Sequence, residues 1–169
     1  RFGINSQLPP VLPLALGAAE MTLEEQVSAF TAFPNDGMRV VPRFIQRVED
    51  SDGNMLEQHH TEAKKAIDEQ TARRMVSLLE GVVEHGTAKA ALALNHPVAG
   101  KTGTTNDFTD AWFVGFSPSV TCGVWVGYDT KTTLGPKETG AEAALPIWMD
   151  VMKAAVADRP NEKFSTAAP

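Results

Sequence analysis

The segment Lys101-Thr102-Gly103-Thr104-Thr105 has residue types that suit the binding of an anionic substrate. A lysine at the start of a strand supplies a cation, and Thr102 and Thr104 place their hydroxyls on one side. Gly103 lets a substrate backbone lie close, so a peptide can dock in β fashion with its terminal carboxylate near the hydroxyls. A backbone N–H at such an edge can also stabilise an oxyanion. The alternative is an ordinary surface strand with a bulge at the glycine, and this segment alone does not separate the two.

A phosphate-binding loop is a third interpretation, because Gly100-Lys101-Thr102 matches the end of that motif. The motif also requires a glycine at position 95, where the chain has Asn95, and a helix directly afterwards. Here a β run follows the segment, so the helix that a phosphate-binding loop requires is missing. We therefore reject phosphate binding at this segment.

The histidines and the cysteine offer weaker candidates. His59 and His60 are adjacent, so on a strand they point to opposite faces and cannot hold one metal ion. His85 is explained by the dipole at a helix C-terminus, and His96 lies near the Lys101 segment without further support. Cys122 lies in an apolar run and is expected to be a core thiol. We expect no metal and no cofactor.

Three β runs surround the candidate site, at 99–105, 111–116 and 120–128. In the last run the even-numbered residues form an apolar face, while Gly123 and Gly127 on the other face would let a helix approach closely. An earlier hairpin is expected where Asp52-Gly53 separates the run 40–49 from Met55-Leu56.

Helices are expected before and after these strands. Thr22 and Glu25 form a capping-box pattern for a helix over about 22–34. Asp68 can cap a second helix, which Gly86 would end in a left-handed conformation. Pro146 can open a third helix. Residues 1–20 contain three prolines and are predicted to be extended, residues 87–96 are ambiguous, and residues 158–169 are expected to be a disordered tail.

Composition limits the class of protein. The chain of 169 residues has 15 Lys and Arg against 21 Asp and Glu, and the resulting formal charge of −6 argues against a nucleic-acid partner. A single cysteine excludes an internal disulfide. No apolar run approaches the length of a membrane span. The sequence therefore describes one globular domain with an adequate core.

Several segments together resemble the C-terminal part of the transpeptidase domain of a class A penicillin-binding protein. The match covers most of residues 1–152 in the expected order. It consists of Leu14-Ala-Leu-Gly-Ala-Ala-Glu-Met-Thr-Leu-Glu-Glu, Phe33-Pro-Asn-Asp-Gly, Gly86-Thr-Ala, Ala99-Gly-Lys-Thr-Gly-Thr-Thr-Asn-Asp, Asp110-Ala-Trp-Phe-Val-Gly-Phe, Gly123-Val-Trp-Val-Gly-Tyr-Asp and Ala144-Leu-Pro-Ile-Trp. Lys-Thr-Gly alone is weak, but its extension through Asn106-Asp107 with the downstream tryptophan strands is specific.

The resemblance implies an α+β fold in which helices cover both faces of an antiparallel sheet, here incomplete, with 1–157 as the C-terminal portion of the domain. It implies a parent enzyme that forms an acyl-serine at the D-Ala-D-Ala end of a peptidoglycan stem peptide, and that β-lactams acylate. Mapped onto this chain, Lys101 supplies positive potential, Thr102 and Thr104 hold the substrate carboxylate, and the Thr104 N–H is one oxyanion donor. Gly103 and Thr105 complete the substrate-binding strand.

Two of the three family motifs are missing. Each serine lacks a lysine three residues later and an asparagine two residues later, so neither Ser-x-x-Lys nor the Ser-x-Asn turn occurs. We therefore expect the nucleophile and its lysine to lie upstream of Arg1, and the chain alone to be inactive. Two sheet strands would be missing with them, which would leave the edge of 120–128 open for dimerisation or strand exchange.

Other functions compatible with these residues are a non-catalytic module that binds peptides or β-lactams, and a related serine carboxypeptidase or β-lactamase. The resemblance implies a periplasmic or cell-surface location, with the parent anchored in the cytoplasmic membrane by a segment outside this chain.

Overall fold

A three-stranded antiparallel sheet forms the centre of the computed structural model, which describes residues 1–17 and 19–167. Its strands are β5 (Ala99–Thr104), β6 (Asp110–Phe116) and β7 (Thr121–Gly127), in the spatial order β5-β6-β7. These bounds confirm the three predicted β runs to within about a residue at each end. Together with its helices, the sheet gives the expected α+β architecture.

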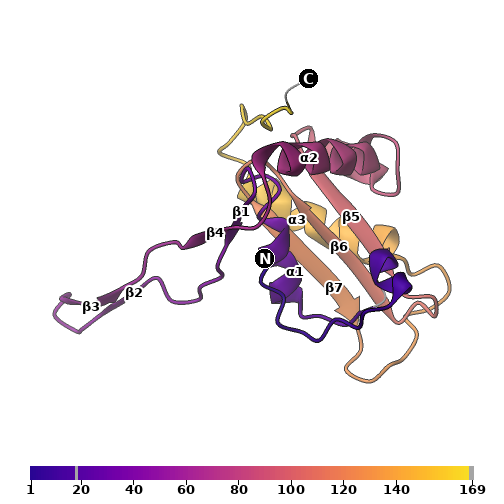
Figure 1. Ribbon diagram of the computed structural model, residues 1–169, viewed down its shortest axis with the longest axis horizontal. Coiled ribbons are helices and arrows are strands. Elements are labelled where there is room, and N and C mark those ends of the chain that lie inside the picture. The colour runs from indigo at the N-terminus through magenta and orange to yellow at the C-terminus, as the bar shows by residue number, and fades with distance from the viewer. Residues whose placement is uncertain (18, 168–169) are drawn as a thin grey trace.

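Helices pack on both faces of this sheet (Figure 1). α1 (Leu23–Phe30) lies against the face that includes Gly123, where an added Cβ would stand 2.5 Å from Cγ2 of Val27. The expected close approach of a helix to the β7 glycines is therefore confirmed at this position. α3 (Leu145–Ala155) covers the opposite face.

The main core lies between α3 and the sheet. Trp148 is completely buried, and its ring packs edge-on against Phe113 with centroids 4.8 Å apart. The Trp148 indole N–H donates to the carbonyl of Cys122 at 3.0 Å, so the polar atom of this buried ring is satisfied. Pro146 stands in the first turn of α3, as predicted.

α2 (Glu69–Glu84) packs at the end of the sheet where β5 begins and β6 ends. Asp68 caps it by accepting the N–H of Thr71 at 2.9 Å, as predicted. The predicted left-handed Gly86 is wrong, because Gly86 is not among the residues with positive φ and His85 caps the helix. A glycine suits this position for a different reason, since an added Cβ would meet the backbone of Val82 at 2.9 Å.

Two further predictions about helices need correction. The proline-rich start is not extended throughout, since residues Leu12–Leu16 form a 3₁₀ helix, η1, in which Pro13 occupies the first turn without losing a helical hydrogen bond. The capping box of Thr22 and Glu25 is confirmed, but α1 ends at Phe30 and turns continue to residue 37. The ambiguous segment after α2 contains a second 3₁₀ helix, η2 (Lys89–Leu94).

A long two-stranded projection, residues 38–65, extends away from the sheet and is called the arm below (Figure 1). Its inner ladder pairs β1 (Met38–Val40) with β4 (Ala63–Lys65), and its outer ladder pairs β2 (Arg47–Glu49) with β3 (Met55–Gln58). The predicted hairpin is confirmed in the outer ladder. The run 40–49 is not one strand. The ladder stops after Val40 and resumes at Arg47, and the stretch between them contains Pro42, which has no N–H to donate.

Residues 158–167 have no regular secondary structure but contact the body of the protein. The ring of Phe164 lies edge-on to Phe116 at 5.7 Å, and Arg159 donates to the hydroxyl of Ser119. The expected division of the chain at residue 157 stays a prediction, and residues 168–169 lie outside the described part. None of the helices described is both long and apolar enough to cross a membrane.

Candidate functional site

The outer edge of β5 carries the candidate site. Bonds in an antiparallel ladder alternate, and the N–H of Thr105 donates to the carbonyl of Asp110 at 3.2 Å, toward β6. The N–H of Thr104 and the backbone groups of Thr102 consequently point to the other side. Among the described residues no strand pairs with β5 on that side. The edge therefore presents the Thr104 N–H where an extended peptide or an oxyanion can accept it.

Lys101 supplies the positive charge at this edge. Its register partner is Val114, so its side chain leaves the sheet on the face opposite to the threonines. The ammonium nevertheless curls to the outer edge, where Nζ lies 2.8 Å from the carbonyl oxygen of Thr102 and 3.4 Å from Oγ1. The exposed cation thus stands beside the threonine hydroxyl rather than across the strand from it.

Thr102 and Thr104 share one face, as predicted, since their partners on β6 are Phe113 and Ala111. Both hydroxyls are already in contact with the protein. Oγ1 of Thr102 lies 2.8 Å from Oγ1 of Thr87, and Oγ1 of Thr104 accepts the N–H of Gly140 at 3.0 Å. With its oxygen accepting this bond, the Thr104 hydroxyl keeps its proton for donation to an anion.

Gly140 begins a short π-helical turn, η3 (Gly140–Ala144), that leads directly into α3. The turn approaches the sheet so closely that an added Cβ would stand 2.2 Å from the Trp112 carbonyl oxygen and 2.6 Å from that of Gly103. Sequence analysis missed the contributions of Gly140 and Thr87. Thr87 belongs to Gly86-Thr-Ala, one of the segments that carry the family resemblance, so that segment could have indicated it. No sequence pattern predicts the hydrogen bond between Gly140 and Thr104.

Thr105 has a different environment from the other threonines. Its hydroxyl oxygen accepts the N–H groups of Thr109 at 2.9 Å and Asp110 at 3.0 Å, which closes the turn between β5 and β6. Asp110 in turn accepts the Thr109 hydroxyl at 2.7 Å and the indole N–H of Trp125 at 2.9 Å. This network fixes the end of the candidate strand.

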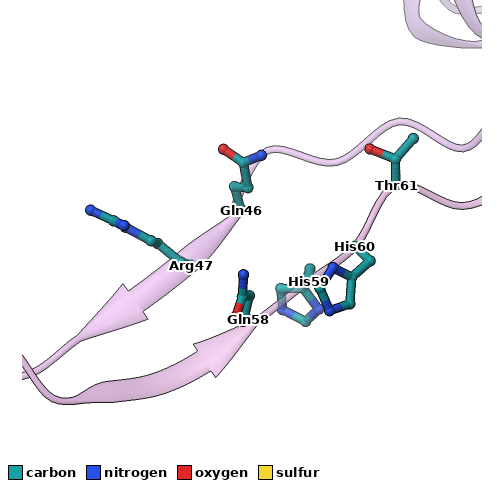
Figure 2. Close-up of a pocket in the computed structure, with 6 residues that line it drawn as sticks. All are labelled: Gln46, Arg47, Gln58, His59, His60 and Thr61. Carbon is teal, nitrogen blue, oxygen red and sulfur yellow. The ribbon is translucent and has the colours of Figure 1, made fainter.

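Three of the four histidine candidates pair with glutamates and not with the Lys101 edge. His59 and His60 line a polar hollow of about 360 Å³ in the arm (Figure 2), which projects away from β5 (Figure 1). His59 pairs with Glu57 at 2.6 Å, and His96 pairs with Glu162 at 3.3 Å. Within the described ranges, no three His, Cys, Asp or Glu side chains are grouped to hold a metal ion. Cys122, predicted to be a core thiol, is only half-buried and packs against the main core, and burial raises the pKa of its thiol.

Comparison with known proteins gives one consistent family. The family model described as "Penicillin binding protein transpeptidase domain" matches residues 10–153. Penicillin-binding protein 1A of Aquifex aeolicus (strain VF5) is 46% identical over 164 residues, covering 97% of this chain and 22% of that protein. The protein of the same name from Rickettsia typhi is 35% identical over 187 residues, covering 97% of this chain and 24% of its own length. The chain therefore spans about a quarter or less of these relatives.

Solved structures agree with the sequence matches. Penicillin-Binding Protein 1A from Haemophilus influenzae superposes with a TM-score of 0.91 at 28% identity, over 98% of this chain and 31% of that one. The penicillin-binding protein PonA1 from Mycobacterium tuberculosis gives a TM-score of 0.87 at 25% identity, over 98% of this chain and 47% of that one. On the extent of the family match and these superpositions, the chain belongs to the penicillin-binding protein transpeptidase family.

Proposed function

We propose that this chain supplies the substrate-binding strand of a peptidoglycan D,D-transpeptidase that works through an acyl-serine intermediate. In this proposal the stem peptide, or a β-lactam, lies along the outer edge of β5. Its carboxylate is held by Lys101, Thr102 and Thr104, and the Thr104 N–H donates to the oxyanion. Gly103 allows the close approach, and Thr105 holds the end of the strand.

The observation that carries the proposal is the convergence of three donors on one unpaired edge. The Lys101 ammonium lies 3.4 Å from the Thr102 hydroxyl, the Thr104 hydroxyl keeps a proton to donate, and the Thr104 N–H points outward. Fixed donors around a developing negative charge are the usual source of stabilisation in acyl transfer. An ordinary surface strand does not require this arrangement.

The nucleophile belongs, in this proposal, to a part of the parent protein outside residues 1–169. This inference is supported by the serines, none of which is followed by lysine three residues later. Covalent catalysis needs such a nucleophile with an adjacent base, so the chain by itself would form no acyl intermediate. The remaining strands of the domain would pair at the open edge of β7, where a second copy of the chain could also associate.

Location follows from the same proposal. A transpeptidase of this kind acts on the wall outside the cytoplasmic membrane, so the parent would work in the periplasm or at the cell surface. Its membrane anchor would lie outside this chain. Neither a cofactor nor a metal ion is part of the proposed chemistry.

A fluorescent penicillin tests the proposal directly. Residues 1–169 alone should give no label that survives a denaturing gel, whereas co-expression with the upstream part of the same gene should restore labelling of the upstream partner. Covalent labelling of the chain itself would refute the absence of a nucleophile. Saturable, non-covalent binding by the chain alone would instead favour a binding module.

Substitution at the site gives the matched control. Lys101→Ala in the reconstituted pair should slow acylation by roughly 10- to 100-fold, because a charge-assisted bond contributes about 1.5–3 kcal/mol. Lys131→Ala removes another exposed lysine and should leave the acylation rate unchanged. Equal rates for the two variants would show that Lys101 does not contact the β-lactam.

A further inference from the structure

The arm exposes apolar side chains that no other part of residues 1–17 and 19–167 covers. Phe44 is 87% exposed and Ile45 59%, while Met55 and Leu56 are 47% and 65% exposed. The first pair lies in the part of the arm nearer the sheet, and the second pair in the part nearer the tip. Large exposed apolar side chains gathered on one projection indicate a surface that another molecule covers.

Charge divides the arm into two opposite halves. The outer half, residues 47–58, has four carboxylates, Glu49, Asp50, Asp52 and Glu57, against one cation, Arg47. The inner half, residues 38–46 and 59–65, has four cations, Arg39, Arg43, Lys64 and Lys65, against one carboxylate, Glu62. The exposed ends of one arm are therefore complementary to the ends of another arm laid in the opposite direction.

The register of the outer ladder shows that the apolar pairs and the oppositely charged halves are centred on about the same point of the arm. Arg47 pairs with Gln58, and the N–H of His59 donates to the carbonyl of Gln46 at 2.9 Å, so the midpoint falls between these pairs. Phe44 and Ile45 stand about two residues inward of this midpoint along the chain, and Met55 and Leu56 about three residues outward. The bulge between Val48 and Glu49 sets Met55 opposite Glu49, between two and three residues from the midpoint along the other strand.

We propose that the arm is a self-association surface, in which two copies of this chain pair their arms antiparallel about a two-fold axis. Such an axis brings segment 44–45 of one copy to the level of segment 55–56 of the other, where one apolar side chain of each pair can face the partner. It also brings Arg43 and Lys64 to the acidic tip that contains Glu49 and Asp52. In a two-fold contact the same surface of each copy meets itself in the opposite direction. The acidic outer half of one arm then faces the basic inner half of the other.

The polar hollow in Figure 2 lies at the proposed axis. It is lined by the side chains of Gln46, Arg47, Gln58, His59, His60 and Thr61, which come from the two sides of the hairpin where the outer ladder ends. An amide side chain has both a donor and an acceptor, so Gln46 and Gln58 can meet the same residues of a second copy. The centre of the contact is thus polar, and the two apolar pairs flank it.

Charge reversal tests this arrangement in the complete chain. The tip variant Glu49→Lys/Asp52→Lys and the base variant Arg43→Glu/Lys64→Glu should each self-associate at least about tenfold more weakly than the wild-type chain in sedimentation experiments, because like charges then face each other. An equimolar mixture of the two variants should recover association as heterodimers. Asp50 is left unchanged because its carboxylate organises the turn at 50–54.

Two controls separate the arm from other contacts. Asp150→Lys/Asp158→Lys makes the same change of charge as the tip variant, but on and after α3, and should leave association unchanged. Phe44→Ser/Leu56→Ser should weaken association without altering the charge. A wild-type chain that stays monomeric, or a dimer that survives both charge reversals, would overturn the proposal; the second result would point to the β7 edge instead.

Discussion

At the scale of single residues, the carboxylate of the half-buried Glu25 accepts an unusual number of hydrogen bonds. It accepts the N–H of Asn5 at 2.6 Å and the N–H of Ser6 at 2.9 Å, as well as the Ser6 hydroxyl. The Ser6 hydroxyl, followed by the backbone of Asn5, lowers the pKa of Glu25 to about 2. The same side chain closes the capping box with Thr22. One residue therefore joins the N-terminal segment to α1.

This pKa predicts an acid-sensitive attachment. A lowered pKa means that the ionised Glu25 stabilises the folded state above the ordinary glutamate pKa of about 4.3, and that this contribution is lost as the pH falls toward about 2. NMR signals from the Asn5 and Ser6 amides should shift with a midpoint near the lower value. Ser6→Ala should move the midpoint upward, and Ser51→Ala should not; a wild-type midpoint near 4.3 would contradict the hydrogen-bonded arrangement.

At the scale of secondary-structure elements, the turn η3 links the loop before α3 to the candidate strand. Its first residue, Gly140, is buried against the carbonyl groups of Gly103 and Trp112. The next element, α3, holds the main core through Trp148. The position of the site edge therefore depends on packing that begins at Gly140.

Glycine substitutions in two elements should have opposite effects. Gly140→Ala should destabilise the chain by about 1–3 kcal/mol, because the new methyl group would overlap backbone atoms that cannot move independently. Gly81→Ala in α2 meets no atom within 4 Å and should stabilise by about 0.5–1 kcal/mol. Urea unfolding followed by circular dichroism measures both. A neutral Gly140→Ala would show that η3 does not approach the sheet this closely.

Short sequence patterns predict the elements that are determined by residues close together in the chain. The capping residues Thr22 and Asp68, the hairpin turn at Asp52-Gly53 and the three β runs all follow from short patterns and are confirmed. The ending of α2 was mispredicted because Gly86 is required by contact with Val82, not by a left-handed backbone. Contacts such as Thr104 with Gly140 join residues 36 positions apart, and no local pattern specifies them.

At the scale of the whole molecule, the sheet has one central strand and two edges. β6 is paired on both sides, whereas β5 and β7 are each paired on one side only among the described residues. The N–H of Ser117 donates to the carbonyl of Val120 at 2.8 Å, which fixes the alternation along β7. The N–H groups of Gly123 and Trp125 consequently point outward, while those of Cys122 and Val124 bond to β6.

Hydrogen exchange should reveal this alternation. In dilute solutions of the chain, the Gly123 and Trp125 amides should exchange much faster than those of Cys122 and Val124, because only the latter are bonded within the sheet. Addition of the upstream part of the parent domain should slow exchange at Gly123 and Trp125 if its strands pair at this edge. Equal protection of all four amides in the dilute chain would contradict an open β7 edge.

The bond between Thr104 and Gly140 has a consequence for how tightly the candidate site can hold an anion. A free threonine hydroxyl rotates among several orientations and forfeits that rotational freedom when a ligand arrives. Here the Gly140 N–H already occupies one lone pair of Oγ1, so folding restricts the rotor before any ligand is present. An anion that bound at this position would meet a hydroxyl preorganised by the Gly140 amide of η3, so substitutions around η3 would tune its affinity without any change in the Lys-Thr-Gly-Thr strand.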